Sequence, residues 1–172
     1  MKQLPLILTL QLLPETAAFF NERRKRYYPA YANRVDAHLT LFYHLPGDNP
    51  RIVESIARAT LREAFDVQVT GLQQFSNGVA YTLSSAELEE WHSALQREWK
   101  ELLIAKDQAP LQPHITIAGK LTAYKTQELY RQLAGMEYPH VIKGIGVEAW
   151  RYQKNRWLKE ETYPFGEMKN ME

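Results

Sequence analysis

Two short stretches of the chain, AHLTLFYHLP (residues 37–46) and PHITIAGK (residues 113–120), share one pattern. In each stretch a histidine opens an apolar run and a threonine follows two residues later, as His38 with Thr40 and His114 with Thr116. Side chains alternate along a β-strand, so each histidine shares a face with its threonine. Two copies of this pattern, 76 positions apart, predict two similar half-domains that face each other across a cleft.

The same alternation predicts which neighbours belong to which face of the first strand. On an unbroken strand His38, Thr40 and Phe42 share one face, and Tyr43 lies on the other face. Each histidine is expected about 7 Å along the strand from its threonine, so the tips of the two side chains can converge on one small group.

Strands and helices are interspersed along the whole chain, which favours α+β or α/β over a pure class. Strands are predicted over residues 6–12, 38–45, 67–72, 79–83, 114–118, 141–150 and 157–163. Helices are predicted over 15–28; from Pro50, capped by Asn49, to about Phe65; from a capping box of Ser84 and Glu87 to Leu102; and from Thr122 to about Leu133.

Composition limits the class of protein. The length of 172 residues suits one domain of two small lobes, and a hydrophobic content of 45% is typical of a globular protein. No apolar run approaches the roughly 20 residues that cross a bilayer, and the chain has no cysteine, which excludes disulfides and thiolate zinc sites. A net charge of +1 argues against wrapping a long duplex and leaves a small anion or one nucleic-acid end as ligand. We expect a cytoplasmic monomer with no membrane segment.

Paired histidine and threonine residues can carry acid–base chemistry on a phosphate. An imidazole moves protons near neutral pH, and a threonine hydroxyl donates a hydrogen bond to an anionic oxygen without adding charge. Two such pairs supply a general base, a general acid and two oxyanion donors without a metal. This set suits hydrolysis of a phosphodiester, especially a cyclic one, whereas a single strand histidine is more often structural.

The paired His-Leu-Thr-Leu and His-Ile-Thr-Ile segments resemble the signature of the 2H phosphoesterase superfamily, which includes RNA 2′,3′-cyclic phosphodiesterases, also called 2′-5′ RNA ligases. The likeness extends over most of the chain and is greatest to a bacterial branch whose first motif continues into Phe-x-His-Leu-Pro-Gly. It implies a single bilobal domain over residues 1–172, with two pseudo-symmetric lobes of antiparallel sheet and outer helices around a V-shaped cleft. It also implies His38 and His114 as the catalytic pair, Thr40 and Thr116 as phosphate binders, and no cofactor or required metal.

Two further residues are candidates for binding substrate. Relatives often carry a basic residue soon after the second motif, and Lys120 is the candidate here, at the rim of the ligand site. Tyr81 is the candidate for stacking a base at the wall of the cleft, with a packed strand tyrosine as the alternative.

Other polar residues have simpler interpretations. The run Arg23–Arg26 could grip RNA through charge and stacking, although such a run is usually a solvated helix face. Glu89 and His92 form one Glu-x-x-His sequence, which we interpret as surface patterning because a di-iron site needs two such copies. His44 is interpreted as a strand-end or turn histidine.

The sequence thus predicts a metal-independent phosphodiesterase acting on the 2′,3′-cyclic phosphate of an RNA end or a nucleotide. A reversible site could also join 2′-5′ RNA ends. The alternative from another class is a module that binds a nucleotide or an RNA end without turnover.

Overall fold

The computed structural model describes residues 4–166, and within them the predicted α+β fold is confirmed. The strands are β1 (Leu6–Leu12), β2 (Thr40–Leu45), β3 (Phe65–Gln74), β4 (Val79–Ser84), β5 (His114–Ala118), β6 (Val141–Gln153) and β7 (Arg156–Pro164). The helices are α1 (Pro14–Tyr27), α2 (Pro50–Ala59), α3 (Ala86–Glu98), α4 (Ala105–Gln108) and α5 (Ala123–Ala134), with a 3₁₀ turn η1 at Lys100–Leu102. No helix in this part of the chain is both long and apolar enough to span a membrane.

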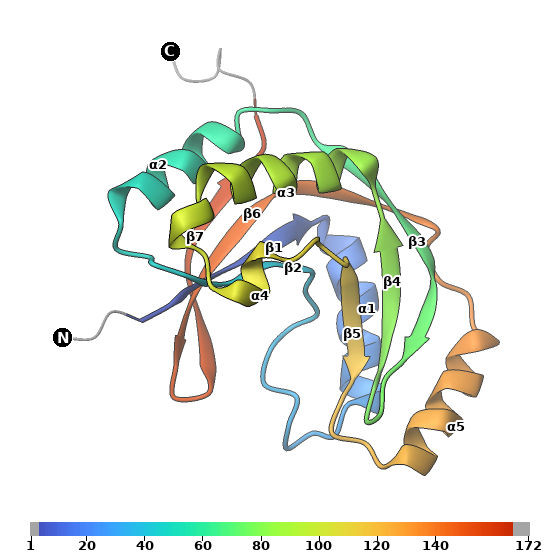
Figure 1. Cartoon of the computed structure of the whole chain (residues 1–172). Coiled ribbons are helices and arrows are strands. Elements are labelled where there is room, and N and C mark those ends of the chain that lie inside the picture. The colour runs from blue at the N-terminus through green and yellow to red at the C-terminus, as the bar shows by residue number, and fades with distance from the viewer. Residues whose placement is uncertain (1–3, 167–172) are drawn as a thin grey trace.

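The described strands form one antiparallel sheet in the order β2-β1-β6-β3-β4-β5, with β7 also paired to β6. The start of β6 pairs with β3, and the rest of β6 lies between β1 and β7. One long strand therefore joins two halves, β2-β1-β6 and β3-β4-β5 (Figure 1). The predicted lobes are halves of one curled sheet, and its two edge strands on this path are β2 and β5.

The helices cross between the two halves. α1 follows β1 in the first half but packs against β5 in the second half, where Phe20 contacts Tyr81 with ring centroids 5.6 Å apart. α3 follows β4 in the second half but packs against β2 in the first, where Trp99 lies 5.0 Å from Phe42. Figure 1 shows α1 behind β4 and β5, with α2 and α3 side by side above the first half. Each half is therefore covered partly by a helix from the other.

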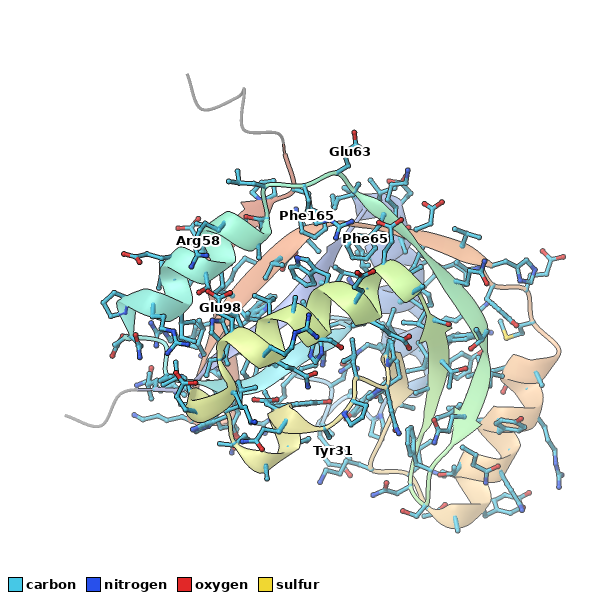
Figure 2. All side chains as sticks on the ribbon, turned by 45° about the horizontal axis from the view of Figure 1, so that its top comes forward. Tyr31, Arg58, Glu63, Phe65, Glu98 and Phe165 are labelled. Atoms are coloured by element: carbon cyan, nitrogen blue, oxygen red, sulfur yellow. The ribbon has the colours of Figure 1, made fainter. Side chains whose placement is uncertain are left out.

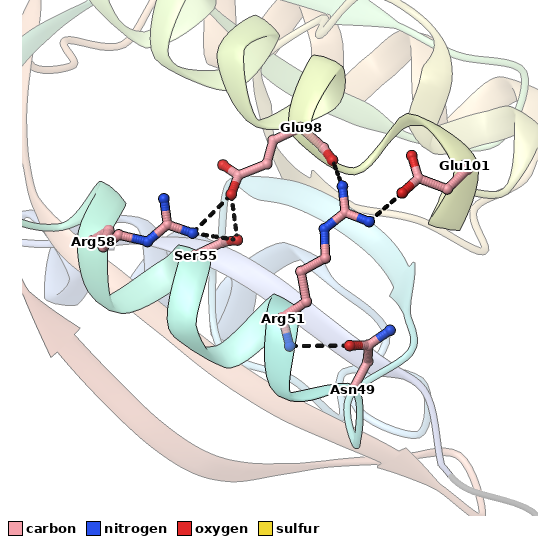
Figure 3. A network of polar contacts seen from close by, with 6 residues as sticks. All are labelled: Asn49, Arg51, Ser55, Arg58, Glu98 and Glu101. Carbon is pink, nitrogen blue, oxygen red and sulfur yellow. Dashed lines mark hydrogen bonds and ion pairs between the residues drawn. The ribbon is translucent and has the colours of Figure 1, made fainter.

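A polar network joins α2 to α3 on the outside of the molecule (Figure 3). The Glu98 carboxylate accepts hydrogen bonds from the Ser55 hydroxyl at 2.7 Å and the Arg58 guanidinium at 2.9 Å. Arg51 donates to the Glu101 carboxylate and to the Glu98 carbonyl. These contacts hold the helix pair over the first half of the sheet.

The helix predicted to reach Phe65 is too long. α2 ends at Ala59, where the Thr60 hydroxyl donates to the Ile56 carbonyl and competes with continuation of the helix. Phe65 instead begins β3, and its ring lies 5.5 Å from that of Phe165, which approaches it from the end of the described chain (Figure 2).

The predicted start of the third helix is wrong by one residue. Ser84 is the last residue of β4, and the N-cap of α3 is Ser85, whose hydroxyl accepts a hydrogen bond from the Leu88 amide at 3.1 Å. Either Ser84 or Ser85 could cap the helix, and the residue at which the preceding strand ends decides which of them does.

Candidate active site

The two motifs lie on the two edge strands of the curled sheet. His38 precedes β2 and Thr40 begins it, while His114 begins β5 and Thr116 follows within it. Thr40 and His114 line the same cavity, which has a volume of about 330 Å³, whereas His38 lines a separate cavity with Thr9 and Trp150. The curl of the sheet therefore brings two motifs together that are distant in sequence.

A β-bulge changes the predicted faces of β2. Thr40 is opposite Thr9 on β1, but Phe42 is opposite Leu8, so one extra residue of β2 is inserted between them. Neighbouring residues of β1 face opposite sides of the sheet, and Thr40 and Phe42 therefore do so as well. The prediction that Phe42 shares the face of Thr40 is wrong: Phe42 is buried in the core, and Tyr43 takes the place on the face of Thr40.

Both imidazoles are held in the same way. His38 Nδ1 lies 2.7 Å from the carbonyl oxygen of Asp36, and His114 Nδ1 lies 2.9 Å from that of Gln112. A carbonyl oxygen can only accept, so Nδ1 of each ring carries the proton and Nε2 is left available for chemistry. The backbone two residues upstream thus fixes one tautomer for each histidine.

His38 occupies a site that disfavours its charged form. Burial lowers the pKa of His38 to about 4 and outweighs the rise caused by the hydrogen bond to the Asp36 carbonyl; the positive charges of Arg24 and His114 lower the pKa further. The ring also lies against Trp157 of β7, with centroids 4.5 Å apart. His38 is therefore neutral at pH 7, with a free lone pair on Nε2.

Aromatic rings from two hairpins flank the two imidazoles. Trp157, after the turn between β6 and β7, contacts His38, and Phe75, after β3, lies 6.2 Å from His114 by ring centroids. Neither aromatic could be assigned to the site from the sequence, because their approach to the motifs depends on how the hairpins cross the sheet.

Two arginines of the basic run on α1 are buried, so neither the RNA-gripping nor the solvated interpretation fits them. Arg24 is 5% exposed and donates to the Thr116 carbonyl at 2.9 Å and to the Asn33 side chain. Arg23 donates to the Tyr81 hydroxyl and the Glu137 carbonyl. Both lie one helical turn after buried Phe20, and this spacing is the sequence signal that places them inward.

His92 is also buried, and its interpretation as surface patterning is wrong. It is 2% exposed, stacks on Phe42 at 4.4 Å, and its Nε2 donates to the Leu41 carbonyl at 2.8 Å. Its place between Leu88 and Leu95 on the apolar stripe of α3 could have identified it. Arg24 and His92 are counterparts, since each donates from a crossing helix to a motif strand at the edge of the sheet.

α4 is fixed to edge strand β2 by one carboxylate. Asp107 is buried and accepts from the Tyr43 amide at 2.8 Å and the His44 amide at 2.9 Å. This arrangement places Lys106 against Tyr43, with its Nζ 3.7 Å from the centre of the ring. The His44 side chain itself is exposed on β2, in keeping with its predicted role.

The two predicted substrate-binding residues lie away from the motif pair. Tyr81 is fully buried and pairs with Ile115, so it lies on the sheet face opposite His114, and its predicted role in stacking a base is wrong. Lys120 is exposed six residues beyond His114, past the end of β5, and is not among the residues that line the cavity.

No group of three or more histidine, aspartate or glutamate side chains that could hold a metal ion occurs within residues 4–166. Each motif histidine has a carbonyl and a threonine as its polar neighbours, a donor set that differs from a tetrahedral zinc site.

Comparison with known proteins identifies relatives over nearly the whole chain. A sequence model of the 2′-5′ RNA ligase superfamily matches residues 12–156. A protein of Staphylococcus aureus (strain Newman) named "Putative phosphoesterase" is 26% identical over 170 residues, covering 92% of this chain and 98% of that protein.

Solved structures share the fold at low sequence identity. TT0787 of Thermus thermophilus superimposes with a TM-score of 0.65 at 16% identity, covering 95% of this chain and 99% of that one. Escherichia coli LigT, crystallised with 3′-AMP, gives a TM-score of 0.59 at 15% identity, covering 96% and 100%. The predicted antiparallel sheet with outer helices is therefore confirmed, and it matches the fold of LigT.

Proposed function

Because the chain belongs to the 2′-5′ RNA ligase superfamily, we propose that it is a phosphoesterase that hydrolyses a 2′,3′-cyclic phosphate at an RNA end or on a nucleotide. One observation carries the proposal: His38, just before edge strand β2, and His114, at the start of edge strand β5, are each held through Nδ1 by the backbone carbonyl two residues upstream. The charge of His114 acts on His38, and two available Nε2 atoms near one another are what in-line displacement at phosphorus requires of an acid and a base.

The two histidines divide the proton transfers. Neutral His38 takes a proton from water through Nε2 while the water oxygen bonds to phosphorus. Protonated His114 gives its Nε2 proton to the ribose oxygen whose bond to phosphorus breaks. The product is a phosphomonoester beside a free ribose hydroxyl, and one proton passed from His38 to His114 through solvent restores the site. The low pKa of His38 favours it as the base.

The threonines act on the phosphate. Thr40 and Thr116 follow their histidines on the motif strands, and their hydroxyls donate to the non-bridging oxygens as charge shifts on phosphorus. E. coli LigT, which shares the fold, was crystallised with 3′-AMP, a compound of the class that opening a cyclic phosphate releases.

Ligation would use the same ring opening with a different nucleophile. If the 5′-hydroxyl of a second RNA replaces water, His38 deprotonates that hydroxyl and the ring-opened phosphate joins the two ends. The superfamily description makes this the second candidate activity.

The test is turnover of a nucleoside 2′,3′-cyclic phosphate and of cyclic-phosphate-ended RNA, with and without EDTA. His38→Ala and His114→Ala should each lower kcat by about 10²–10⁴-fold, the usual worth of a general acid or base. The double variant should be much less than multiplicatively slower, because the two residues act as a unit. His44→Ala is the matched control, because it removes an exposed imidazole from the same strand.

Substitution of the threonines should lower kcat less than substitution of the histidines. Thr40→Ala and Thr116→Ala each remove one hydrogen bond to a charged oxygen, worth roughly 1.5–3 kcal/mol, and should slow turnover about 10- to 100-fold. A wild-type protein that binds these compounds without hydrolysing them would support the non-catalytic binding module instead. Near-normal turnover by His114→Ala would exclude the two-histidine mechanism.

A further inference from the structure

The cavity beside Thr40 and His114 extends past the reacting groups to a second cluster of polar side chains. Tyr43 and Lys106 line this part of it. Burial raises the pKa of the Tyr43 phenol, and a hydrogen bond with the Thr40 side chain opposes that rise. The Lys106 ammonium lies on the ring of this tyrosine, 3.7 Å from its centre. The cation is therefore one aromatic ring away from the Thr40 hydroxyl, which is proposed to bind the reacting phosphate.

The fold places Lys106 there and leaves its charge available. The neighbouring Asp107 carboxylate accepts two β2 amides, from Tyr43 and His44, so it anchors α4 instead of pairing with the lysine. Among residues 4–166 no carboxylate lies within ion-pair distance of Lys106. The side chain is exposed at the mouth of the cavity, where a ligand can reach it.

We propose that Lys106 binds a second phosphate of the substrate, one ribose away from the phosphate held between the motifs. This inference rests on the proposed function and adds a substrate class to it: a nucleotide with a phosphate on its 5′ oxygen as well as the reacting phosphate. The 5′ phosphate is either a terminal monoester or the last linkage of an RNA chain. An ammonium over an aromatic ring suits a phosphate of either kind, since it supplies charge without fixed geometry.

Binding of stable product analogues tests the inference without turnover. Isothermal titration calorimetry compares adenosine 3′-monophosphate, adenosine 3′,5′-bisphosphate and the dinucleotide ApAp with a 3′-terminal phosphate. The wild-type protein should bind at least one of the last two about 10-fold or more tightly than the monophosphate, the effect of one added charge-assisted contact. A gain confined to ApAp identifies an RNA end as the ligand, and a gain with the bisphosphate identifies a free nucleotide.

Variants assign the gain to Lys106. Lys106→Met should reduce the affinity ratio to about 1, and Lys106→Arg should keep most of it, because the charge remains. Lys125→Met, which changes an exposed lysine on α5, is the matched control and should keep the wild-type ratio. Circular dichroism should show the same fold for all three variants.

Two results would overturn the inference: equal affinity of the wild type for all three compounds, or a preference that persists in Lys106→Met. Failure of the proposed function has a different signature, which is no hydrolysis of any cyclic phosphate. A protein without turnover that still shows the Lys106-dependent preference would retain the second phosphate site.

Discussion

A charged residue that does not touch the substrate helps to set the state of His38. Burial is the main cause of the low pKa of His38, and the charge of Arg24, which donates to the backbone of Thr116, lowers that pKa further. The charge of His114 also lowers this pKa, whereas Asp36 raises it through its carbonyl and its charge. Trp157 covers the His38 ring. We interpret Arg24 as a positioning residue that keeps the base neutral.

This role predicts a shift in the pH profile. A base must be neutral to work, so its activity falls as the pH drops through its pKa. Arg24→Met removes a positive charge and should raise the pKa of His38, moving the acidic limb of kcat/KM toward neutral pH. Arg24→Lys should restore most of the wild-type profile. Lys25→Met, at the exposed neighbouring position, is the control, and an acidic limb that stays in place in Arg24→Met would disprove the role.

At the scale of the element, the bulged strand β2 depends on one carboxylate. Asp107 accepts the amides of Tyr43 and His44, which no other described group takes up. Asp107→Ala should leave two backbone donors without partners at a buried site and lower the free energy of unfolding by about 1–3 kcal/mol. Urea denaturation measures the change.

The control for this prediction is a surface carboxylate. Asp66→Ala removes an exposed side chain, 3.7 Å from Lys143, and should change the free energy of unfolding by less than about 0.5 kcal/mol. Equal stability of the two alanine variants would show that β2 does not need its anchor.

The elements were largely predictable from periodicity, and the motif positions with them. The second His-x-Thr pair lies on β5 as predicted, whereas β2 begins only at Thr40, so His38 lies just before its strand. The bulge that exchanges Phe42 and Tyr43 was not predictable, because it depends on the register against β1. Asp107 and Lys106 gave no local signal either, since their roles arise only when α4 meets a strand more than 60 residues away.

At the scale of the whole molecule, buried neutral histidines make stability depend on pH. Burial lowers the pKa of His92 and of His38 below the ordinary value of 6.5. The unfolded chain then binds more protons than the folded one below that value, so both residues contribute stability that is complete above pH 6.5 and is lost as the pH falls. Glu98 and Glu101, whose pKa values are lowered from 4.5, act only at lower pH.

The free energy of unfolding should therefore decrease between pH 7.5 and pH 5, before the carboxylates titrate. His92→Gln can still donate to the Leu41 carbonyl and should show a shallower decrease. His140→Gln, at an exposed position, should keep the wild-type slope. Chemical denaturation at several pH values measures all three, and identical slopes for wild type and His92→Gln would contradict the prediction.

The crossing of α1 and α3 between the halves has a consequence for synthesis of the chain. As the protein leaves the ribosome, β1, α1 and β2 emerge well before β5, so Arg24 has no Thr116 carbonyl to bind and His38 has no partner. The Leu41 carbonyl of β2 likewise has no donor until α3, which carries His92, has been synthesised. A nascent or truncated chain would hold only half of the proposed acid–base pair. Hydrolysis of a cyclic phosphate through this pair would therefore begin only after most of the polypeptide has been synthesised.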